Sequence, residues 1–259
     1  SEDLSGASWQ TVSEAFSWPL STGDGPKTVY VQLRDAAGLV STVDASVILD
    51  TTAPGGTFLI DGGAEYVTRT TVSLTMGFED PFGLNEVRVS NEPDLGDSVW
   101  LPYTTGMTWE LIEQEGERMV YVQVRDMAGN LASVSAAVTL DLSDPDVTLV
   151  INDGDEATLD MDVLLTWTAS DTSGLTEYAI ADARDLGGAV WRPLSGETSI
   201  EDATDEHALA GTDGLKTVYL GVRDAAGRTG TSSDSIWYVS SRPEGRMVIA
   251  DGSGWTNST

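Results

Sequence analysis

Six aspartates recur as two sets of three, and their positions suggest sites for a hard cation. The first set is Asp50, Asp80 and Asp126, and the second is Asp141, Asp171 and Asp224. In each set one aspartate closes a repeat, one lies in a turn between two predicted strands and one lies in a predicted hairpin turn. Three carboxylates that converge repel one another unless they are protonated or bridged, and Ca²⁺ accepts about six to eight oxygen ligands. The pattern therefore predicts two Ca²⁺ sites, with Asp144 close to the second.

The same aspartates can also be interpreted as ordinary turn residues. Asp is common in turns, where its carboxylate caps backbone amides or pairs with Arg. At the third junction Val239 stands in the place of Asp50 and Asp141, and Arg242 lies nearby, so no cation is expected there. Both interpretations stay open for the first two sets.

A twelve-residue stretch that occurs three times positions these aspartates along the chain. It reads KTVYVQLRDAAG at residues 27–38, RMVYVQVRDMAG at 118–129 and KTVYLGVRDAAG at 216–227. Its aspartates, Asp35, Asp126 and Asp224, are 91 and 98 residues apart, which is the length of a small β-sandwich domain. A catalytic motif is rarely written three times, whereas a stacked structural unit must be. The repeat therefore indicates tandem domains.

Prolines that follow each motif aspartate by 19 residues mark the domain boundaries. The predicted domains are a partial repeat at 1–53 with C-terminal strands only, full repeats at 54–144 and 145–242, and the first strand region of another repeat at 243–259. The third copy carries a seven-residue insertion between Trp191 and Lys216. Because the first copy lacks the segment that matches 55–91, either the polypeptide continues on both sides or a neighbouring molecule supplies strands by strand addition.

The local patterns within a copy are those of strands. Val29, Val31 and Leu33 alternate with polar residues, and a run from Val134 to Leu140 alternates in the same way. The motif is interpreted as the sixth strand of a unit and the turn into the seventh, with the three apolar residues of the first copy in the core. The predicted fold is all-β, with immunoglobulin-like β-sandwich repeats in tandem and incomplete first and last copies.

The charge of the chain excludes several partners. Its 42 acidic residues against 13 Lys and Arg leave a net charge of −29, so phosphate-rich nucleic acid and anionic lipid are unfavourable partners. Cysteine is absent, which excludes disulfides, thiolate metal sites and a Cys nucleophile. No apolar run approaches the roughly 18 residues of a membrane span, so we expect no direct membrane insertion.

Five segments of the sequence resemble the bacterial and archaeal immunoglobulin-like repeats of cell-surface proteins. The resemblance lies in DTTAP at 50–54, IDGGAEY at 60–66, SNEPDLGDSVW at 90–100, VRDMAGN at 124–130 and SGL at 173–175. It implies an extracellular, surface-exposed repeat, and related repeats of giant adhesins bind Ca²⁺ at inter-domain aspartates. The expected function is a non-enzymatic structural segment of a surface layer, filament or stalk, with self-association or neighbouring repeats as partners. The alternative is an adhesin or a carbohydrate-binding module of a larger secreted protein.

Other residues that could support chemistry have simpler structural interpretations. Trp9, Trp100 and Trp191 recur at one position, which favours packing over a glycan-stacking platform. His207, the single histidine, occupies the column of Trp18 and Trp109, and no nucleophile motif accompanies it.

Two further candidates lie outside the repeated positions. Glu201 and Asp202 could imitate a glycosidase pair, but they fall in the insertion, which we expect to be a solvated loop. Asn257 starts an N-x-S/T sequon and is a candidate glycosylation site on the extracellular interpretation.

Overall fold

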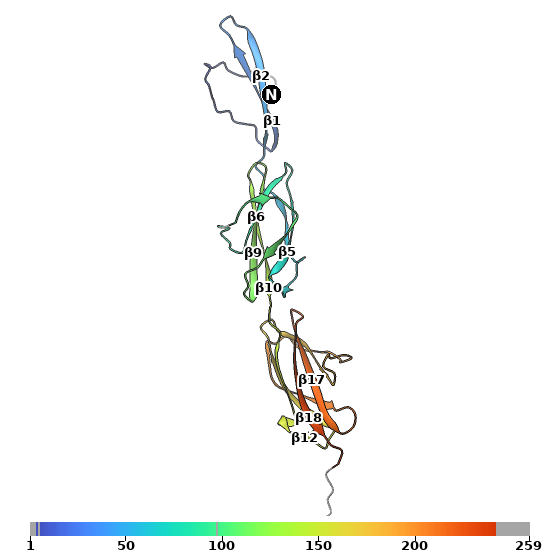
Figure 1. Cartoon of the computed structure of the whole chain (residues 1–259). Helices are drawn as coiled ribbons and strands as arrows, with labels where there is room; N and C mark the ends of the chain where they lie inside the picture. The colour runs from blue at the N-terminus through green and yellow to red at the C-terminus, as the bar shows by residue number, and fades with distance from the viewer. Residues whose placement is uncertain (1–3, 5, 97, 242–259) are drawn as a thin grey trace, which may run out of the picture. The chain divides into compact units, whose positions relative to one another are not determined.

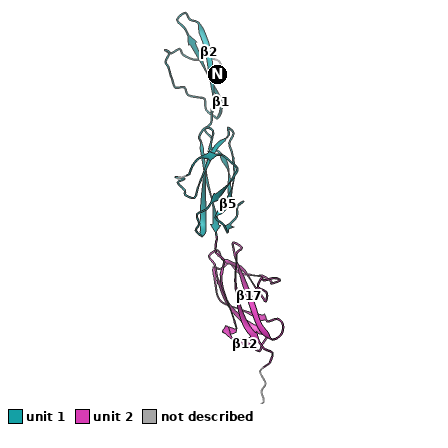
Figure 2. Ribbon diagram, viewed as in Figure 1, with its two compact units in different colours: residues 1–140 teal, residues 141–259 magenta. Residues whose placement is uncertain are grey.

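The chain is all-β and falls into two compact units. The computed structural model describes residue 4, residues 6–96 and residues 98–241, and its strands are shown in Figure 1. Unit 1 comprises residues 1–140 and unit 2 residues 141–259 (Figure 2). Among the described residues, no helix has the length and apolar character needed to cross a membrane. Asn257, Arg242 and the predicted partial repeat at 243–259 lie outside the described residues.

Unit 1 begins with a hairpin that forms a sheet of its own. Strands β1 (Gly25–Arg34) and β2 (Val40–Leu49) pair antiparallel only with each other. Val29 and Val31 are half-buried, whereas Leu33 is 48 % exposed. The prediction that all three residues lie in a core is therefore wrong for Leu33, because the apolar face of this hairpin is not closed by a second sheet within the described residues.

The rest of unit 1 is a sandwich of two sheets. Its strands are β3 (Gly55–Ile60), β4 (Tyr66–Val67), β5 (Thr71–Glu79), β6 (Leu84–Ser90), β7 (Leu101–Pro102), β8 (Gly106–Glu110), β9 (Gly116–Asp126) and β10 (Leu131–Leu140). One sheet has the order β3-β5-β8 and the other β4-β10-β9-β6-β7. Every second residue of β5, from Val72 to Phe78, is buried, which is the alternation that a strand with one covered face requires.

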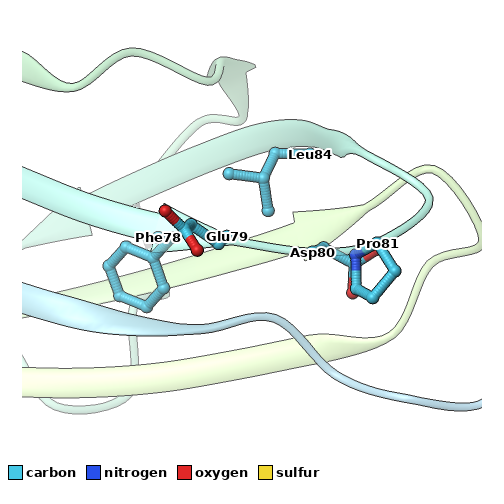
Figure 3. Close-up of a pocket in the computed structure, with 5 residues that line it drawn as sticks. All are labelled: Phe78, Glu79, Asp80, Pro81 and Leu84. Carbon is cyan, nitrogen blue, oxygen red and sulfur yellow. The ribbon is translucent and has the colours of Figure 1, made fainter.

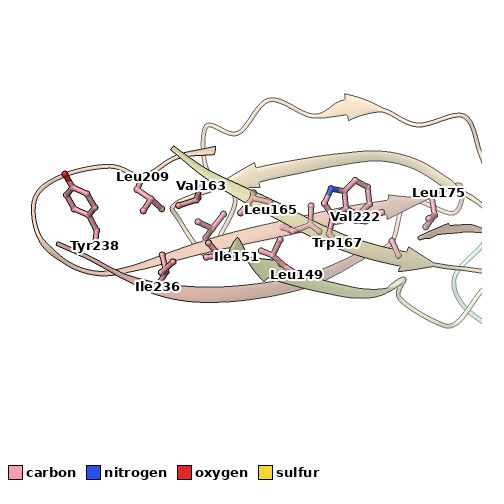
Figure 4. Close-up of a cluster of buried hydrophobic side chains, with 13 residues drawn as sticks. Leu149, Ile151, Val163, Leu165, Trp167, Leu175, Leu209, Val222, Ile236 and Tyr238 are labelled. Atoms are coloured by element: carbon pink, nitrogen blue, oxygen red, sulfur yellow. The ribbon is translucent and has the colours of Figure 1, made fainter. Parts of the chain in front are cut away.

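Unit 2 repeats the same order of strands. Its elements are β11 (Asp146–Ile151), the 3₁₀ turn η1 (Asn152–Gly154), β12 (Ala157–Thr158), β13 (Asp162–Ser170), β14 (Leu175–Ala181), β15 (Arg192–Pro193), β16 (Ser199–Ala208), β17 (Gly214–Asp224) and β18 (Thr229–Tyr238). The sheets are β11-β13-β16 and β12-β18-β17-β14-β15. Buried side chains from both sheets, including Leu165, Trp167 and Ile236, meet in the core (Figure 4).

The prediction of tandem immunoglobulin-like sandwiches is confirmed by these two equivalent strand orders. The predicted strands at the repeated motif and along the run from Val134 to Leu140 are present. The turn that follows the motif does require its glycine, since Gly129 and Gly227 have φ angles of 95° and 85°. The domain boundaries expected at 53/54 and 144/145 stay predictions.

Two features of the sandwiches differ from expectation. Short edge strands pair in parallel with the last strand of each sandwich, β4 with β10 and β12 with β18, and the sequence pattern did not reveal them. The insertion is not a solvated loop, because it extends β16 to ten residues where β8 has five. Glu201 and Asp202 are exposed residues of that strand.

Candidate metal centre

Each set of three aspartates comes together within one unit. In unit 1, Asp50 follows β2, Asp80 follows β5 and Asp126 ends β9, and one carboxylate oxygen from each lies within 4.8 Å of the others. Asp141, Asp171 and Asp224 form the same arrangement in unit 2. The turns after strands of different sheets converge at one end of a sandwich, which brings together residues that are far apart in sequence.

One carboxylate oxygen of each aspartate in unit 1 is engaged in turn chemistry. The backbone N–H of Thr52 donates to Asp50 Oδ1 at 3.1 Å, and that of Phe82 donates to Asp80 Oδ1 at 2.8 Å. Asp126 Oδ1 accepts three backbone N–H groups of its own hairpin turn, at 2.7–2.9 Å. The turn interpretation is therefore correct for Oδ1 and says nothing about the second oxygen.

The second oxygen is unpartnered in four of the six aspartates. The Oδ2 atoms of Asp50, Asp80, Asp141 and Asp224 are buried and have no hydrogen-bond partner within the described part of the chain. Asp141 and Asp224 are each only 2 % exposed, and Asp50 is 8 % exposed. A buried carboxylate oxygen without a partner is costly, so these atoms mark a place where a cation would be stabilising.

The pKa values of two cluster aspartates are raised by burial and by the like charges beside them. Burial raises the pKa of Asp50, and the nearby charges of Asp80 and Asp126 raise it further. Burial likewise raises the pKa of Asp224, with Asp141 and Asp171 adding to the effect. A positive ion between the carboxylates would remove both penalties.

Asp126 differs from its counterpart Asp224. Burial acts to raise the pKa of Asp126, but hydrogen bonds from the side chain and backbone of Asn130 and from two other backbone amides outweigh it, so the pKa is lowered. The Asn130 side-chain amide donates to Asp126 Oδ2 at 2.8 Å and to the Asp50 carbonyl oxygen at 3.2 Å. Asn130 thus connects two members of the first cluster.

Arg228 stands in unit 2 where Asn130 stands in unit 1. Its backbone N–H donates to Asp224 Oδ1 at 2.9 Å, but its guanidinium forms an ion pair with Asp144 at 2.9 Å. Its Nε is buried and has no partner within the described residues. Sequence reasoning had not singled out Asn130 or Arg228, although each lies four residues after a cluster aspartate and could have been found by comparing the two hairpin turns.

Asp35 belongs to neither cluster. Its Oδ1 accepts the N–H groups of Ala37 and Leu39 at 2.9 and 2.8 Å, as a turn residue would.

A cavity next to the first cluster is lined by Phe78, Glu79, Asp80, Pro81 and Leu84 (Figure 3). Outside the cluster itself, Glu79 is the one ionisable group in this lining, so the cavity offers few contacts to orient a polar ligand.

The recurring tryptophans pack against the arginine of the repeated motif. The Arg34 guanidinium lies 4.3 Å from the Trp9 ring centre, and that of Arg223 lies 3.8 Å from the Trp191 ring centre. Trp100 contacts two guanidinium groups at 4.6 and 4.8 Å. Each of these cation–π contacts covers a ring face on which a sugar could otherwise stack, which favours the packing interpretation over a glycan platform.

His207 also has a structural partner. Its Nε2 lies 2.8 Å from Asp182 Oδ1. In unit 1 the equivalent pair is Trp109 and Asn91, joined by an indole N–H that donates to the amide oxygen at 2.8 Å. The expectation that His207 is a substituted structural position is therefore supported.

Comparison with known proteins finds likenesses among solved β-sandwich structures. No protein-family model matches the sequence, and no curated protein matches it. Fibronectin(III)-like modules of Clostridium thermocellum CbhA are 14 % identical, with a TM-score of 0.39, and the match covers 74 % of this chain and 100 % of theirs. A tetra-tandem repeat from the extending region of a large adhesion protein is 19 % identical, with a TM-score of 0.28, and the match covers 84 % of this chain and 57 % of that chain.

A two-domain fibronectin type-III segment of chicken tenascin is 11 % identical, with a TM-score of 0.32 and coverage of 72 % of this chain and 99 % of that segment. At these levels of similarity the fold assignment rests on the strand order of the chain itself. The three proteins say nothing about what this chain binds.

Proposed function

We propose that this chain is a non-enzymatic structural segment of an extracellular repeat protein, and that its two aspartate clusters bind Ca²⁺. The observation behind the metal site is the set of buried Oδ2 atoms that have no partner among the described residues, two in each cluster. Turn chemistry accounts for the Oδ1 atoms and, through Asn130, for Asp126 Oδ2, but not for the four unpartnered Oδ2 atoms, so a separate reason is needed for gathering these four atoms away from solvent. A bound cation supplies that reason.

The ligand chemistry favours Ca²⁺ over softer metals. Each cluster offers three carboxylates and no nitrogen or sulfur ligand among its members. Hard oxygen donors in a flexible arrangement suit Ca²⁺, which completes its coordination with backbone carbonyls and water. Extracellular modules bind Ca²⁺ with dissociation constants of about 10⁻⁴–10⁻³ M, and such weak sites are occupied in a calcium-rich environment.

The mechanical role follows from where the three ligands lie. In unit 1 a cation would tie the segment after β2 to the turn after β5 and to the β9–β10 hairpin. In unit 2 it would tie Asp141, at the start of the unit, to the corresponding two turns. Cross-linking three segments in this way restricts local opening, which is the property that a stalk, filament or layer component needs.

Thermal unfolding with and without Ca²⁺ tests this function. We expect the midpoint to rise by several degrees in 5 mM Ca²⁺ over EGTA, and to rise little in the same concentration of Mg²⁺, because Mg²⁺ demands a tighter octahedral geometry. A double variant, Asp80→Asn with Asp171→Asn, keeps the Oδ1 acceptors and removes one charge from each cluster. The response to Ca²⁺ should be lost in this variant. If the unfolding midpoint of the wild-type chain is the same in Ca²⁺ and in EGTA, the metal proposal is wrong.

A further inference from the structure

We infer that the residue four positions after the hairpin aspartate sets the cation affinity of each cluster, so that the Asn130 cluster binds Ca²⁺ more tightly than the Arg228 cluster. This inference rests on the proposed Ca²⁺ function and adds a ranking of the two sites with the residue responsible. Asn130 and Arg228 contact cluster aspartates without being obvious ligands themselves, so they are positioning residues.

The first part of the argument is pre-organisation in unit 1. Asn130 donates through one amide nitrogen to Asp126 Oδ2 and to the Asp50 carbonyl oxygen. With three further N–H groups on Oδ1, the Asp126 carboxylate is held by its own turn from both sides. A carboxylate that is already oriented loses less freedom when it binds a metal, and removing such outer contacts typically costs about 10- to 100-fold in metal affinity.

The second part is the positive charge beside the cluster in unit 2. Arg228 is anchored to Asp224 through its backbone N–H, and its Nε is buried with no acceptor in the part of the chain that the structure describes. The Arg228 side chain is 25 % exposed and pairs with Asp144, so the hairpin turn that carries Asp224 also carries a positive charge, and a like charge on this turn disfavours a bound cation. Asp224 also lacks the side-chain amide that orients Asp126, which leaves its Oδ2 unpartnered.

The third part is that unit 2 has its own cross-link between the same segments. The Arg228–Asp144 ion pair joins the hairpin turn to the segment that follows Asp141. In unit 1 the residue at the place of Asp144 is Ala53, which has no charge to offer. Unit 2 therefore has one contact between these two segments that unit 1 lacks, although it contributes little because the Asp144 side chain is 59 % exposed.

Calorimetric titration of the full chain with CaCl₂ tests the ranking, using one variant to isolate each site. Asp171→Asn leaves the cluster of unit 1 intact, and Asp80→Asn leaves that of unit 2 intact. We expect the Ca²⁺ affinity of the Asp171→Asn chain to be higher than that of the Asp80→Asn chain by a factor of about ten or more. Equal affinities, or the reverse order, would overturn the inference while leaving the proposed function standing. If neither chain binds Ca²⁺, the proposed function itself fails.

Replacement of Arg228 then tests the residue responsible. In the Asp80→Asn background, Arg228→Asn should tighten Ca²⁺ binding several-fold, whereas the charge-conserving Arg228→Lys should leave it weak. In the Asp171→Asn background, Asn130→Ala should weaken binding by about tenfold, and it provides a second test if Arg228→Asn disturbs the fold. If the Asn and Lys variants of Arg228 bind Ca²⁺ alike and Asn130→Ala changes nothing, these residues do not set the affinity.

Discussion

The two sandwiches share a strand order but differ in chemistry at four equivalent positions that run from the core to the surface. In unit 1 the positions are apolar, namely Met76, Val87, Leu101 and Met107, and in unit 2 they are Trp167, Tyr178, Arg192 and Asp205. Met76 is 1 % exposed and Val87 is fully buried, whereas in unit 2 Asp205 binds the other three side chains.

The polar group in unit 2 is tolerated because its members satisfy one another. The Trp167 indole N–H donates to Asp205 Oδ2 at 3.1 Å, and the Tyr178 hydroxyl donates to Asp205 Oδ1 at 3.2 Å. Arg192 reaches Asp205 Oδ1 at 2.5 Å, and the Trp167 and Tyr178 rings lie 4.9 Å apart. Such a network either is complete or costs stability, so its residues must change together. The comparison teaches that strand order depends on which positions face inward, while side-chain identity is free to vary in coordinated sets.

The largest effect is expected when one polar residue of the unit 2 network is replaced by its apolar counterpart from unit 1. Asp205→Met leaves the Trp167 indole and the Tyr178 hydroxyl without an acceptor, and we expect a loss of about 2–4 kcal/mol in the free energy of unfolding of unit 2. Hydrogen exchange of the β13 and β14 amides measures it. Met107→Leu in unit 1 is the matched control and should cost less than about 1.5 kcal/mol. Unaltered protection in Asp205→Met would show that the network does not stabilise the fold.

A close backbone approach in unit 2 offers the next largest effect. A Cβ added to Gly230 would lie 1.9 Å from the Pro145 carbonyl oxygen, although unit 1 has Ala132 at the equivalent position. Gly230→Ala should therefore force β11 and β18 apart and destabilise unit 2 by about 1–3 kcal/mol. Urea unfolding checks this value, with the exposed neighbour Thr231→Ala expected within about 0.5 kcal/mol of wild type. If both variants unfold at the same urea concentration, the contact yields more readily than the geometry indicates.

The hairpin aspartates should respond to pH in opposite directions when calcium is removed. Burial raises the folded-state pKa of Asp224 above its ordinary 3.8, so its ionised form costs stability at neutral pH, and this cost is relieved as the pH falls through the raised pKa. The pKa of Asp126 is lowered, so its contribution is present above 3.8 and is lost as the pH falls through the lowered value. Carboxyl-carbon NMR in EDTA should find Asp224 titrating above 3.8 and Asp126 below it. A common pKa would contradict the difference in their hydrogen bonds.

The smallest effect concerns a surface pair that the two units build differently. Asp182→Asn with His207→Trp converts the pair of unit 2 into the Asn91–Trp109 pair of unit 1. The Asp182 side chain is 47 % exposed, so its contact with His207 contributes little, and we expect the double variant within about 0.5 kcal/mol of wild type in thermal unfolding. A loss of several kcal/mol in the free energy of unfolding would show that His207 stabilises the fold through contacts other than the one with Asp182.

The fold was largely predictable from the sequence because alternation is a local signal. The period of two in the repeated motif and in β10 identified these strands, and the repeated motif revealed the tandem arrangement. The meeting of the aspartates was also expected, since loops at one end of an immunoglobulin-like unit are neighbours. The extension of β16 escaped prediction, because the polar insertion lacks an apolar face that would mark it as a strand.

The repeat pattern in the sequence established tandem β-sandwiches, because a repeated motif with a period of two marks the same strand in each unit. Tertiary structure alone decided which polar atoms are left without partners. The Oδ2 atoms of Asp50 and Asp224, the Asn130 bridge and the Arg228–Asp144 ion pair depend on distances between segments tens of residues apart. A local pattern cannot encode those distances, because they are determined by how the turns of different strands pack together.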